Sequence, residues 1–392
     1  MNEGLETIIN TTKTVLASRG WFLEKCSRCQ RYYFTKIERP NCQDPACESN
    51  PLFLQLNPHG KPRLLSEIAN HIKLYFRELN FFPAHLDNVV AQLGETLFII
   101  AAIQVLDQFI YTNLSVPTEP LIVAQPSIRL NYMDRIGEQE GFSSSFVNVA
   151  SEEFVTSIKR YSVHLNIWLD CLSSLGLHAN QITLIAEIVP FDSGPYYGNY
   201  LIFNYAGIEL GEGIYINKIK TKKEDDLRLL EFAFGLERIL WAVNKTRLYY
   251  HNFGLLTARM QGNFIFTDAV RTATLMVMSG VQPSHRAQGG KLRLVIKKII
   301  KHLDQNNLEL NISHSYGEWS HFIKPVKSVE NCFTIIQKEI NRQINLKICA
   351  EIGIKTNKFD LHSTPEQFCD YLLKQGFKLE KILDVGNIFK HD

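Results

Sequence analysis

The 392-residue sequence has no long hydrophobic run, little net charge and no low-complexity segment. Its most apolar stretch, residues 96–106, is far shorter than the roughly 20 residues that a membrane-spanning helix needs. Residues 1–13 mix acidic, basic and polar side chains, so we expect no secretory signal. The net charge of +2 does not by itself indicate a nucleic-acid partner. We therefore expect a cytoplasmic protein with reduced cysteines and no membrane contact.

The two commonest phosphate-binding loops are also missing. There is no G-x-x-x-x-G-K-[ST] segment, and no G-x-G-x-x-G segment follows a predicted strand. The glycines Gly207, Gly211 and Gly213 have the wrong spacing and are interpreted as strand and turn residues. A phosphate site in this chain would need side-chain cations instead, such as Arg129 on a predicted strand and Arg238 on a predicted helix.

The surroundings of Arg238 raise a specific question. The segment EFAFGLERIL places this arginine among apolar side chains, and a guanidinium cannot lose its charge there. Burying it is costly unless an anion pairs with it. The sequence leaves that anion open between a nearby carboxylate, Glu237 or Glu231, and the phosphate of a ligand.

The composition and the order of predicted elements indicate a folded chain of two or three domains. It is 45% hydrophobic and 21% charged, which is typical of globular proteins. Strand-like runs dominate between residues 97 and 205, and helical patterns dominate from residue 227 onward. We predict an α+β fold with an N-terminal module (residues 1–58), a catalytic-type domain (residues 59–252) and a helical domain (residues 253–392).

Four cysteines near the N-terminus have the spacing of a metal site. Cys26, Cys29, Cys42 and Cys47 form a C-x2-C pair, a gap of twelve residues and a C-x4-C pair. Two such pairs can place four thiolates around Zn²⁺, and four thiolates leave no open position for catalysis. We therefore predict structural zinc; free cysteines and disulfides are the alternatives, the second disfavoured by the compartment.

Several segments together identify a family. QPSIRLNYMDRIG, GLERILWAV and the cysteine pattern resemble the archaeal type of alanyl-tRNA synthetase, a class II aminoacyl-tRNA synthetase. The resemblance continues colinearly through ITLIAEIVPFDSGP, AGIELG, VQPSHRAQGGKLRLVIKKI and FDLHSTPEQF. It implies an antiparallel catalytic sheet with flanking helices, the zinc module before it and a helical acceptor-stem domain after it. The editing and C-terminal domains of the family have no counterpart in the sequence.

The resemblance also implies a site for ATP with Mg²⁺. Arg129 matches the arginine that clamps the α-phosphate, and Arg238 matches the one that meets the terminal phosphates. Phe146 matches the aromatic residue that stacks on adenine, and Glu209 matches an acid near the nucleotide and its Mg²⁺. Gly235 lies in the same motif as Arg238 and is assigned to the ATP site. Such cations suit the transfer of a phosphoryl group, which needs little covalent chemistry from the protein.

The amino-acid pocket departs from the family pattern. Glu231 stands where the family has the aspartate that receives the substrate's ammonium group, and Ala233 replaces a glycine. Glu187 is retained, but the tryptophan and glycine run that follow it in the family are missing. One extra methylene in such a pocket changes discrimination by about 1–3 kcal/mol. We expect alanine or a related small amino acid, without strict specificity for alanine.

Motif 2 of the family is altered as well. Its Arg-His pair is replaced by Gly141 and Phe142, and its glutamate by Val147. Each lost charged donor costs about 1.5–3 kcal/mol of phosphate binding, so weaker ATP binding or slower reaction is expected.

The predicted helical tail carries candidate contacts to tRNA. In KLRLVIKKIIKHL the apolar residues share one face, and Arg293 and Lys297 lie four residues apart on another. Such a basic stripe is either a solvated face or a nucleic-acid site. His285 and Asp360 match the positions that read the identity base pair of the tRNA in the family, with His285 replacing an asparagine.

We therefore expect an enzyme that makes an aminoacyl-adenylate from ATP and an amino acid and passes it to a tRNA or another acceptor. Two alternatives remain. One is a catalytically inactive relative that binds tRNA acceptor stems, and the other is a ligase that acts on a carrier protein or small amine without any RNA.

Overall fold

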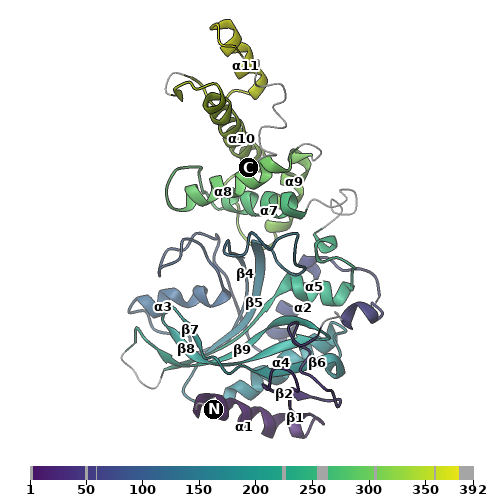
Figure 1. Ribbon diagram of the computed structural model, residues 1–392. Helices are drawn as coiled ribbons and strands as arrows, with labels where there is room; N and C mark the ends of the chain where they lie inside the picture. The colour runs from purple at the N-terminus through teal and green to yellow at the C-terminus, as the bar shows by residue number, and fades with distance from the viewer. Residues whose placement is uncertain are drawn as a thin grey trace. The chain divides into compact units, whose positions relative to one another are not determined.

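The computed structural model describes residues 3–48, 52–58, 60–222, 227–253, 264–303, 307–356 and 359–378 (Figure 1). The chain divides into two compact units. The first comprises Met1–Leu86, Ala91–Ser127 and Phe146–Phe253, and the second comprises Asp87–Val90, Ile128–Ser145 and Gly254–Asp392. The second unit thus combines the helical tail with the loop that precedes Phe146 and with a short segment from earlier in the chain.

The first unit is built on one large sheet, which confirms the predicted α+β class. The strand order is β1-β2-β6-β8-β9-β10-β5-β4-β3, with β7 paired to β8 off this path. Among the pairs whose register is described, seven are antiparallel, from β1–β2 through β6–β8 and β8–β9 to β10–β5, whereas β3 and β4 run parallel. The strands are β1 (Phe22–Lys25), β2 (Tyr32–Thr35), β3 (Phe82–Ala84), β4 (Leu121–Ile128), β5 (Ser145–Val155), β6 (Ile182–Ala186), β7 (Phe191–Ser193), β8 (Tyr196–Tyr205), β9 (Ile208–Ile219) and β10 (Arg228–Gly235).

Strand β10 shows how the two faces of the sheet are covered. Successive side chains of a strand point to opposite faces. Phe232 and Phe234 contact the helix α4 (Lys159–Ser174): the ring centroids of Phe234 and Trp168 lie 4.2 Å apart. Leu229 and Ala233 point the other way and pack against the segment formed by η2 (Ala102–Leu106) and α3 (Asp107–Tyr111). The sheet centre is therefore buried on both faces.

Further helices surround this sheet. Helix α1 (Glu3–Ala17) packs against β8 and α4, and α2 (Leu65–Glu78) packs against α4 and α5 (Leu236–Asn244). The short η1 (Leu52–Gln55) places Phe53 edge-on to Trp241 of α5, with ring centroids 4.7 Å apart. The remaining short helices of this unit are η3 (Ala179–Gln181) and η4 (Tyr249–Asn252).

The predicted glycine roles are confirmed in β9. Gly207 has a left-handed backbone with φ +97°, as a turn requires. Gly211 lies on the strand, where an added Cβ would come within 2.1 Å of the Ala233 carbonyl oxygen. Gly207 thus lies in the turn before β9 and Gly211 within the strand, as the spacing predicts.

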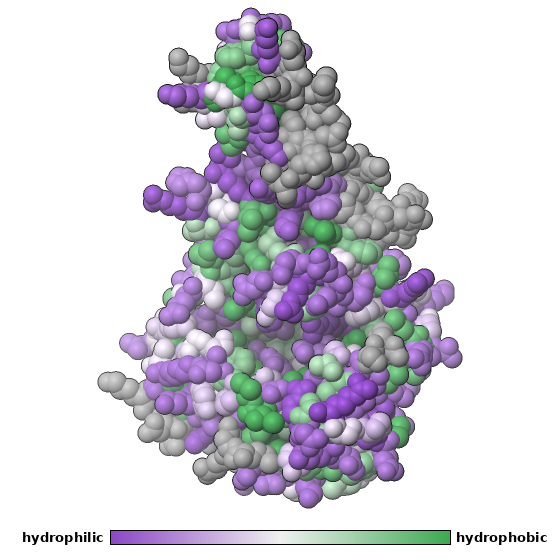
Figure 2. Space-filling view, viewed as in Figure 1, coloured by the Kyte–Doolittle hydropathy of each residue, from purple (hydrophilic) through white to green (hydrophobic). Residues whose placement is uncertain are grey.

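The second unit is helical. It contains α7 (Phe264–Met278), α8 (Ala287–Lys301), α9 (Leu308–Trp319), α10 (Val329–Glu351) and α11 (Pro365–Lys374). The predicted apolar face of α8 is confirmed, since Leu292, Val295, Ile296 and Ile299 are all fully buried. Figure 2 shows hydrophilic side chains projecting from the surface, with smaller apolar patches between them. None of the helices in the described ranges is long and apolar enough to cross a membrane.

A buried polar network joins the loop before β5 to α7 within this unit. The Ser144 backbone N–H donates to Asp268 at 2.8 Å, and the Ser144 hydroxyl contacts both Asp268 and Thr272. Burial raises the pKa of Asp268 to about 6, against these hydrogen bonds. The guanidinium of Arg271 stacks on Trp319 and donates to the Ser145 carbonyl at 3.3 Å. These contacts explain why residues 128–145 group with the helices.

Candidate active site

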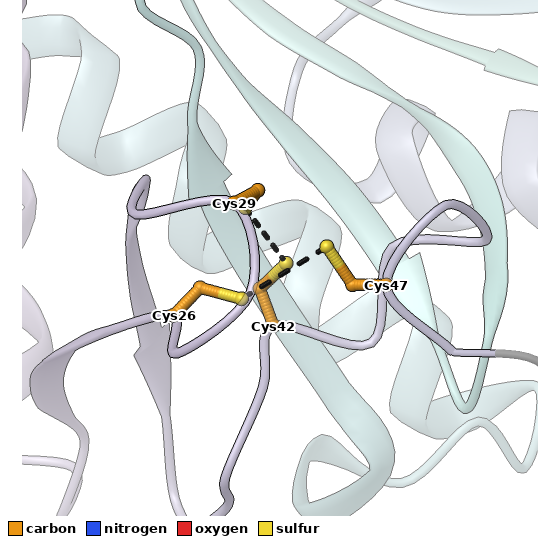
Figure 3. A group of neighbouring side chains, drawn as sticks. All are labelled: Cys26, Cys29, Cys42 and Cys47. Carbon is orange, nitrogen blue, oxygen red and sulfur yellow. Dashed lines mark hydrogen bonds between the residues drawn. The ribbon is translucent and has the colours of Figure 1, made fainter.

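The four N-terminal cysteines converge, as the spacing predicts. Their sulfur atoms all lie within 4.8 Å of one another, with Cys26–Cys47 at 3.9 Å and Cys29–Cys42 at 3.8 Å (Figure 3). Thiolates held tetrahedrally at a Zn–S distance of about 2.3 Å are separated by about 3.8 Å, so the cluster fits this ion. The structure has all eight cysteines as free thiols, and none of them is in a disulfide.

The polypeptide around the cluster also suits a metal-bound thiolate. Burial opposes ionisation of Cys26, but backbone hydrogen bonds from Cys29, Cys42 and Arg28 lower its pKa to about 6. Burial raises the pKa of Cys47 to about 11, so this thiol needs a cation to ionise near neutral pH. The Arg31 side chain donates to the Cys29 sulfur at 3.4 Å, which is the kind of contact that orients a metal ligand.

Arg31 also connects the cysteine module to the central sheet. Its guanidinium pairs with Asp44 and with Glu187, both at 2.6 Å, and all three side chains are largely buried. Glu187 additionally accepts the backbone N–H groups of Ile188 and Val189. The structure thus gives Glu187 a position beside the metal module, and its assignment to the amino-acid pocket stays a prediction.

The anion beside Arg238 is Glu209. Arg238 is the third residue of α5, directly after β10, and its Nη1 lies 3.1 Å from Glu209 Oε1 and 3.2 Å from the Glu209 carbonyl oxygen. The sequence named Glu237, Glu231 or a phosphate as the partner and did not consider Glu209 in this role. The two side chains remain 30% and 49% exposed, so the pair is open to solvent and to a ligand.

Glu237 has a structural contact that the sequence did not reveal. It is 1% exposed, and both carboxylate oxygens accept the backbone N–H of Val147, at 3.1 and 3.0 Å. The first turn of α5 is thereby fixed to β5, and Arg238 is held next to it in sequence.

Phe146, Glu152 and Glu231 lie on one face of the sheet. Glu231 of β10 pairs with Glu152 of β5 in the antiparallel register, and Gly235 pairs with Asn148. Side chains two residues apart on a strand lie on the same face, so Phe146 lies on the same face as Asn148 and Glu152. Gly235 ends β10 and precedes α5, and a Cβ there would come within 3.7 Å of the Arg238 side chain.

Arg129 lies at the end of β4 rather than within it. The strand ends at Ile128, and Arg129 is exposed, although its backbone N–H still donates to the Ser144 carbonyl at 2.9 Å. The loop that follows carries a second exposed cation, Arg135, whose guanidinium lies 5.0 Å from the Tyr132 ring and 5.4 Å from the Phe142 ring. Phe142 therefore takes part in an aromatic–cation stack with Arg135.

The helical unit holds the predicted tRNA contacts in different settings. Lys297 and His285 are exposed, the second in the loop before α8. Arg293 instead forms an ion pair with Glu339 of α10, with its Nε 3.0 Å from Oε1. Asp360 is exposed and accepts the backbone N–H of His362 at 3.0 Å. The predicted basic stripe is thus partly used for packing between α8 and α10.

Comparison with known proteins agrees with the motifs. The alanine–tRNA ligase of Methanosphaera stadtmanae is 23% identical over 76% of this chain, and that of Methanococcoides burtonii is 25% identical over 87% of it. The alanine–tRNA ligase of Methanococcus aeolicus is 24% identical over 75% of the chain. The chain is similar to archaeal alanine–tRNA ligases. No model of a protein family matches it.

This synthetase-like chain spans only part of its relatives. It covers 40%, 34% and 34% of the three ligases. Among solved structures, a pyrrolysyl-tRNA synthetase of Desulfitobacterium hafniense matches 47% of this chain and 71% of its own, at 14% identity and a TM-score of 0.37. A likeness of that size says nothing about activity.

Proposed function

We propose that this synthetase-like chain activates a small amino acid with ATP and passes the aminoacyl group to a tRNA or another acceptor. In the first step an amino-acid carboxylate oxygen forms a bond to the α-phosphorus, and the bond to pyrophosphate breaks. Arg129 would hold the α-phosphate, and Arg238 the terminal phosphates. Glu231 would receive the α-ammonium group, with Glu187 as a further amino-acid contact.

One observation carries this proposal. Phe146 and Glu231, assigned to adenine and to the amino acid, share one face of the two adjacent strands β5 and β10. The Glu209–Arg238 pair lies where β10 passes into α5 and is partly exposed. Exposed guanidinium and carboxylate groups suit a triphosphate with its Mg²⁺, because each can exchange its present partner for a charge of the ligand.

The four-cysteine cluster would hold Zn²⁺ in a structural role. Its four sulfur ligands complete the coordination, so the ion takes no part in the reaction. His285, Lys297 and Asp360 are the exposed candidates for contacts to a tRNA acceptor stem, with Arg293 positioned by Glu339.

The test is amino-acid-dependent exchange between pyrophosphate and ATP across the proteinogenic amino acids, with Arg238→Ala as the paired variant. We expect exchange with at least one small amino acid and its loss in the variant. Transfer to tRNA is then measured with the same amino acid. Exchange without transfer to any tRNA would favour a ligase that acts on another acceptor.

A second candidate is an inactive relative that binds acceptor stems. It is favoured by the loop before β5, where Gly141 and Phe142 replace the Arg-His pair and the ring of Phe142 stacks with Arg135. This candidate predicts tRNA binding that weakens steeply with salt, together with no exchange for any amino acid.

A further inference from the structure

The most unusual group in the described residues is the carboxylate of Glu152. It is fully buried on β5, and neither oxygen has a hydrogen-bond partner. Buried carboxylates are costly without a partner, and native proteins keep very few of them. An unsatisfied carboxylate in a well-packed sheet is therefore a sign that something else completes the site.

The carboxylates nearest in the fold do not relieve this cost. Glu231, 3% exposed, is directly opposite Glu152 on β10. Asp107, at the junction of η2 and α3, is 7% exposed, and its Oδ1 lies 3.4 Å from the Tyr196 hydroxyl. Burial raises the pKa of Glu152 well above its usual value, and the charges of Glu231 and Asp107 raise it further. In the described part of the chain, the charged groups that act on Glu152 are both acids.

The location adds a second, independent point. Glu152 and Glu231 share the face of the sheet that carries Phe146, and that is the face of the proposed amino-acid pocket. Glu153, the next residue on β5, points to the opposite face, where it pairs with Arg160 and His164. Of the two neighbouring glutamates, Glu153 pairs with basic side chains of α4, and Glu152 has no hydrogen-bond partner on the face assigned to the proposed pocket.

We propose that the amino-acid pocket takes a small α-amino acid that carries a second ammonium group on its side chain. Glu231 receives the α-ammonium group, and Glu152 receives the side-chain ammonium group. This inference rests on the proposed function for the location of the pocket. A side-chain ammonium group would give the Glu152 carboxylate the charged hydrogen-bond donor that neither of its oxygens has in the structure.

The test compares ligands that differ only by the second amino group. Binding of 2,3-diaminopropionate and alanine, and of 2,4-diaminobutyrate and 2-aminobutyrate, is measured by titration calorimetry on the full chain without ATP. We expect the diamino acid of each pair to bind roughly 10- to 100-fold more tightly, the usual effect of one charged hydrogen-bonded contact. Equal or weaker binding of both diamino acids would overturn the proposal.

The matched variants are Glu152→Gln and Glu153→Gln. Glu152→Gln should remove the preference within each ligand pair, whereas Glu153→Gln should retain it. The free Glu152→Gln protein should melt no lower than the wild type, because a neutral amide replaces a carboxyl group whose ionised form is disfavoured there. A preference that survives Glu152→Gln, in a variant with unchanged circular dichroism, would also overturn the proposal.

The experiments distinguish a failure of this inference from a failure of the proposed function. Exchange of pyrophosphate with neutral amino acids alone, without a diamino preference in binding, rejects the second ammonium site and keeps the activation step. A diamino preference in binding without exchange for any amino acid keeps the site and rejects the activation step.

Discussion

Arg238 Nη1 lies 3.1 Å from Glu209 Oε1, and this pair joins the start of α5 to β9 across the end of β10. Both residues had been assigned to ATP from the sequence, yet in the structure they are bound to each other. An ion pair with this much exposure contributes about 0–1 kcal/mol to stability. Separating the two side chains therefore costs little free energy. Residues that exchange each other for a ligand's phosphates and Mg²⁺ need this property.

We predict that Arg238→Ala separates ATP binding from stability. Removing a guanidinium from a phosphate contact should weaken ATP binding about tenfold or more. The melting temperature should change little, because the exposed pair contributes little to the folded state. Both quantities can be measured on one preparation, by calorimetric titration with Mg-ATP and by thermal unfolding.

The control for this variant is Arg228→Ala, which removes an arginine at the opposite end of β10. ATP binding that is equal in the wild type and in Arg238→Ala would exclude a phosphate role for Arg238. A large fall in melting temperature would instead identify the pair as structural.

Metal content gives the next prediction. Cys42 is fully buried, and Cys42→Ser should remove Zn²⁺ from the purified protein and lower its melting temperature, because the other three thiolates cannot close the coordination. Cys369→Ser serves as the control, since Cys369 lies on α11 and does not belong to the cluster. Mass spectrometry of the metal should find one Zn²⁺ per chain in the wild type and the control. The prediction would be contradicted if the wild type contained no Zn²⁺ and Cys42→Ser had the same melting temperature as the wild type.

The sequence was informative wherever a pattern repeats locally. The cysteine spacing predicted a cluster because two close Cys pairs a short distance apart are the usual pattern of a structural zinc site. The apolar positions of residues 292–299 predicted the buried face of α8 because helical periodicity has a fixed period. The α+β class followed from the same kind of local information, the change from strand-like to helical runs.

Pairings between distant residues were beyond the sequence. Glu209 reaches Arg238, and Arg31 reaches Glu187, only because β9, β10 and β6 are ordered as they are in the sheet. Strand order and register involve residues far apart in the chain, and one sequence does not encode them in any local pattern. Glu152 was missed for this reason, since only the register places it opposite Glu231.

Helix α8 allows packing and RNA contacts to be separated. Arg293→Ala should lower the melting temperature, because Arg293 pairs with Glu339, a buried side chain of α10. Lys297→Ala should leave stability unchanged, because Lys297 is exposed. It should reduce the slope of the logarithm of the tRNA-binding constant against the logarithm of the salt concentration by roughly one. Binding is measured by filter assay from low to high salt. An unchanged slope in Lys297→Ala would remove this residue from the proposed interface.

The last prediction concerns Asp107 and pH. Burial raises the pKa of Asp107 from 3.8 to about 6, so the folded state holds this proton more tightly than the unfolded state. The stabilising contribution of Asp107 is therefore complete below its unfolded pKa and is lost as the pH rises through about 6. A shift of this size corresponds to about 3 kcal/mol at most.

Asp107→Asn should remove this dependence, because the amide keeps the shape of the protonated acid and does not titrate. Urea unfolding at a series of pH values gives the free energy of unfolding for both proteins. The free energy of unfolding of the variant should rise relative to that of the wild type between about pH 4 and pH 6.5. Above this range the difference between the two proteins should stay constant. A difference that stays constant across this range would show that the Asp107 carboxylate is as well solvated in the folded protein as in the unfolded chain. That result would also weaken the proposed ammonium site at Glu152, because the charge of Asp107 is one of the causes that raise the pKa of Glu152.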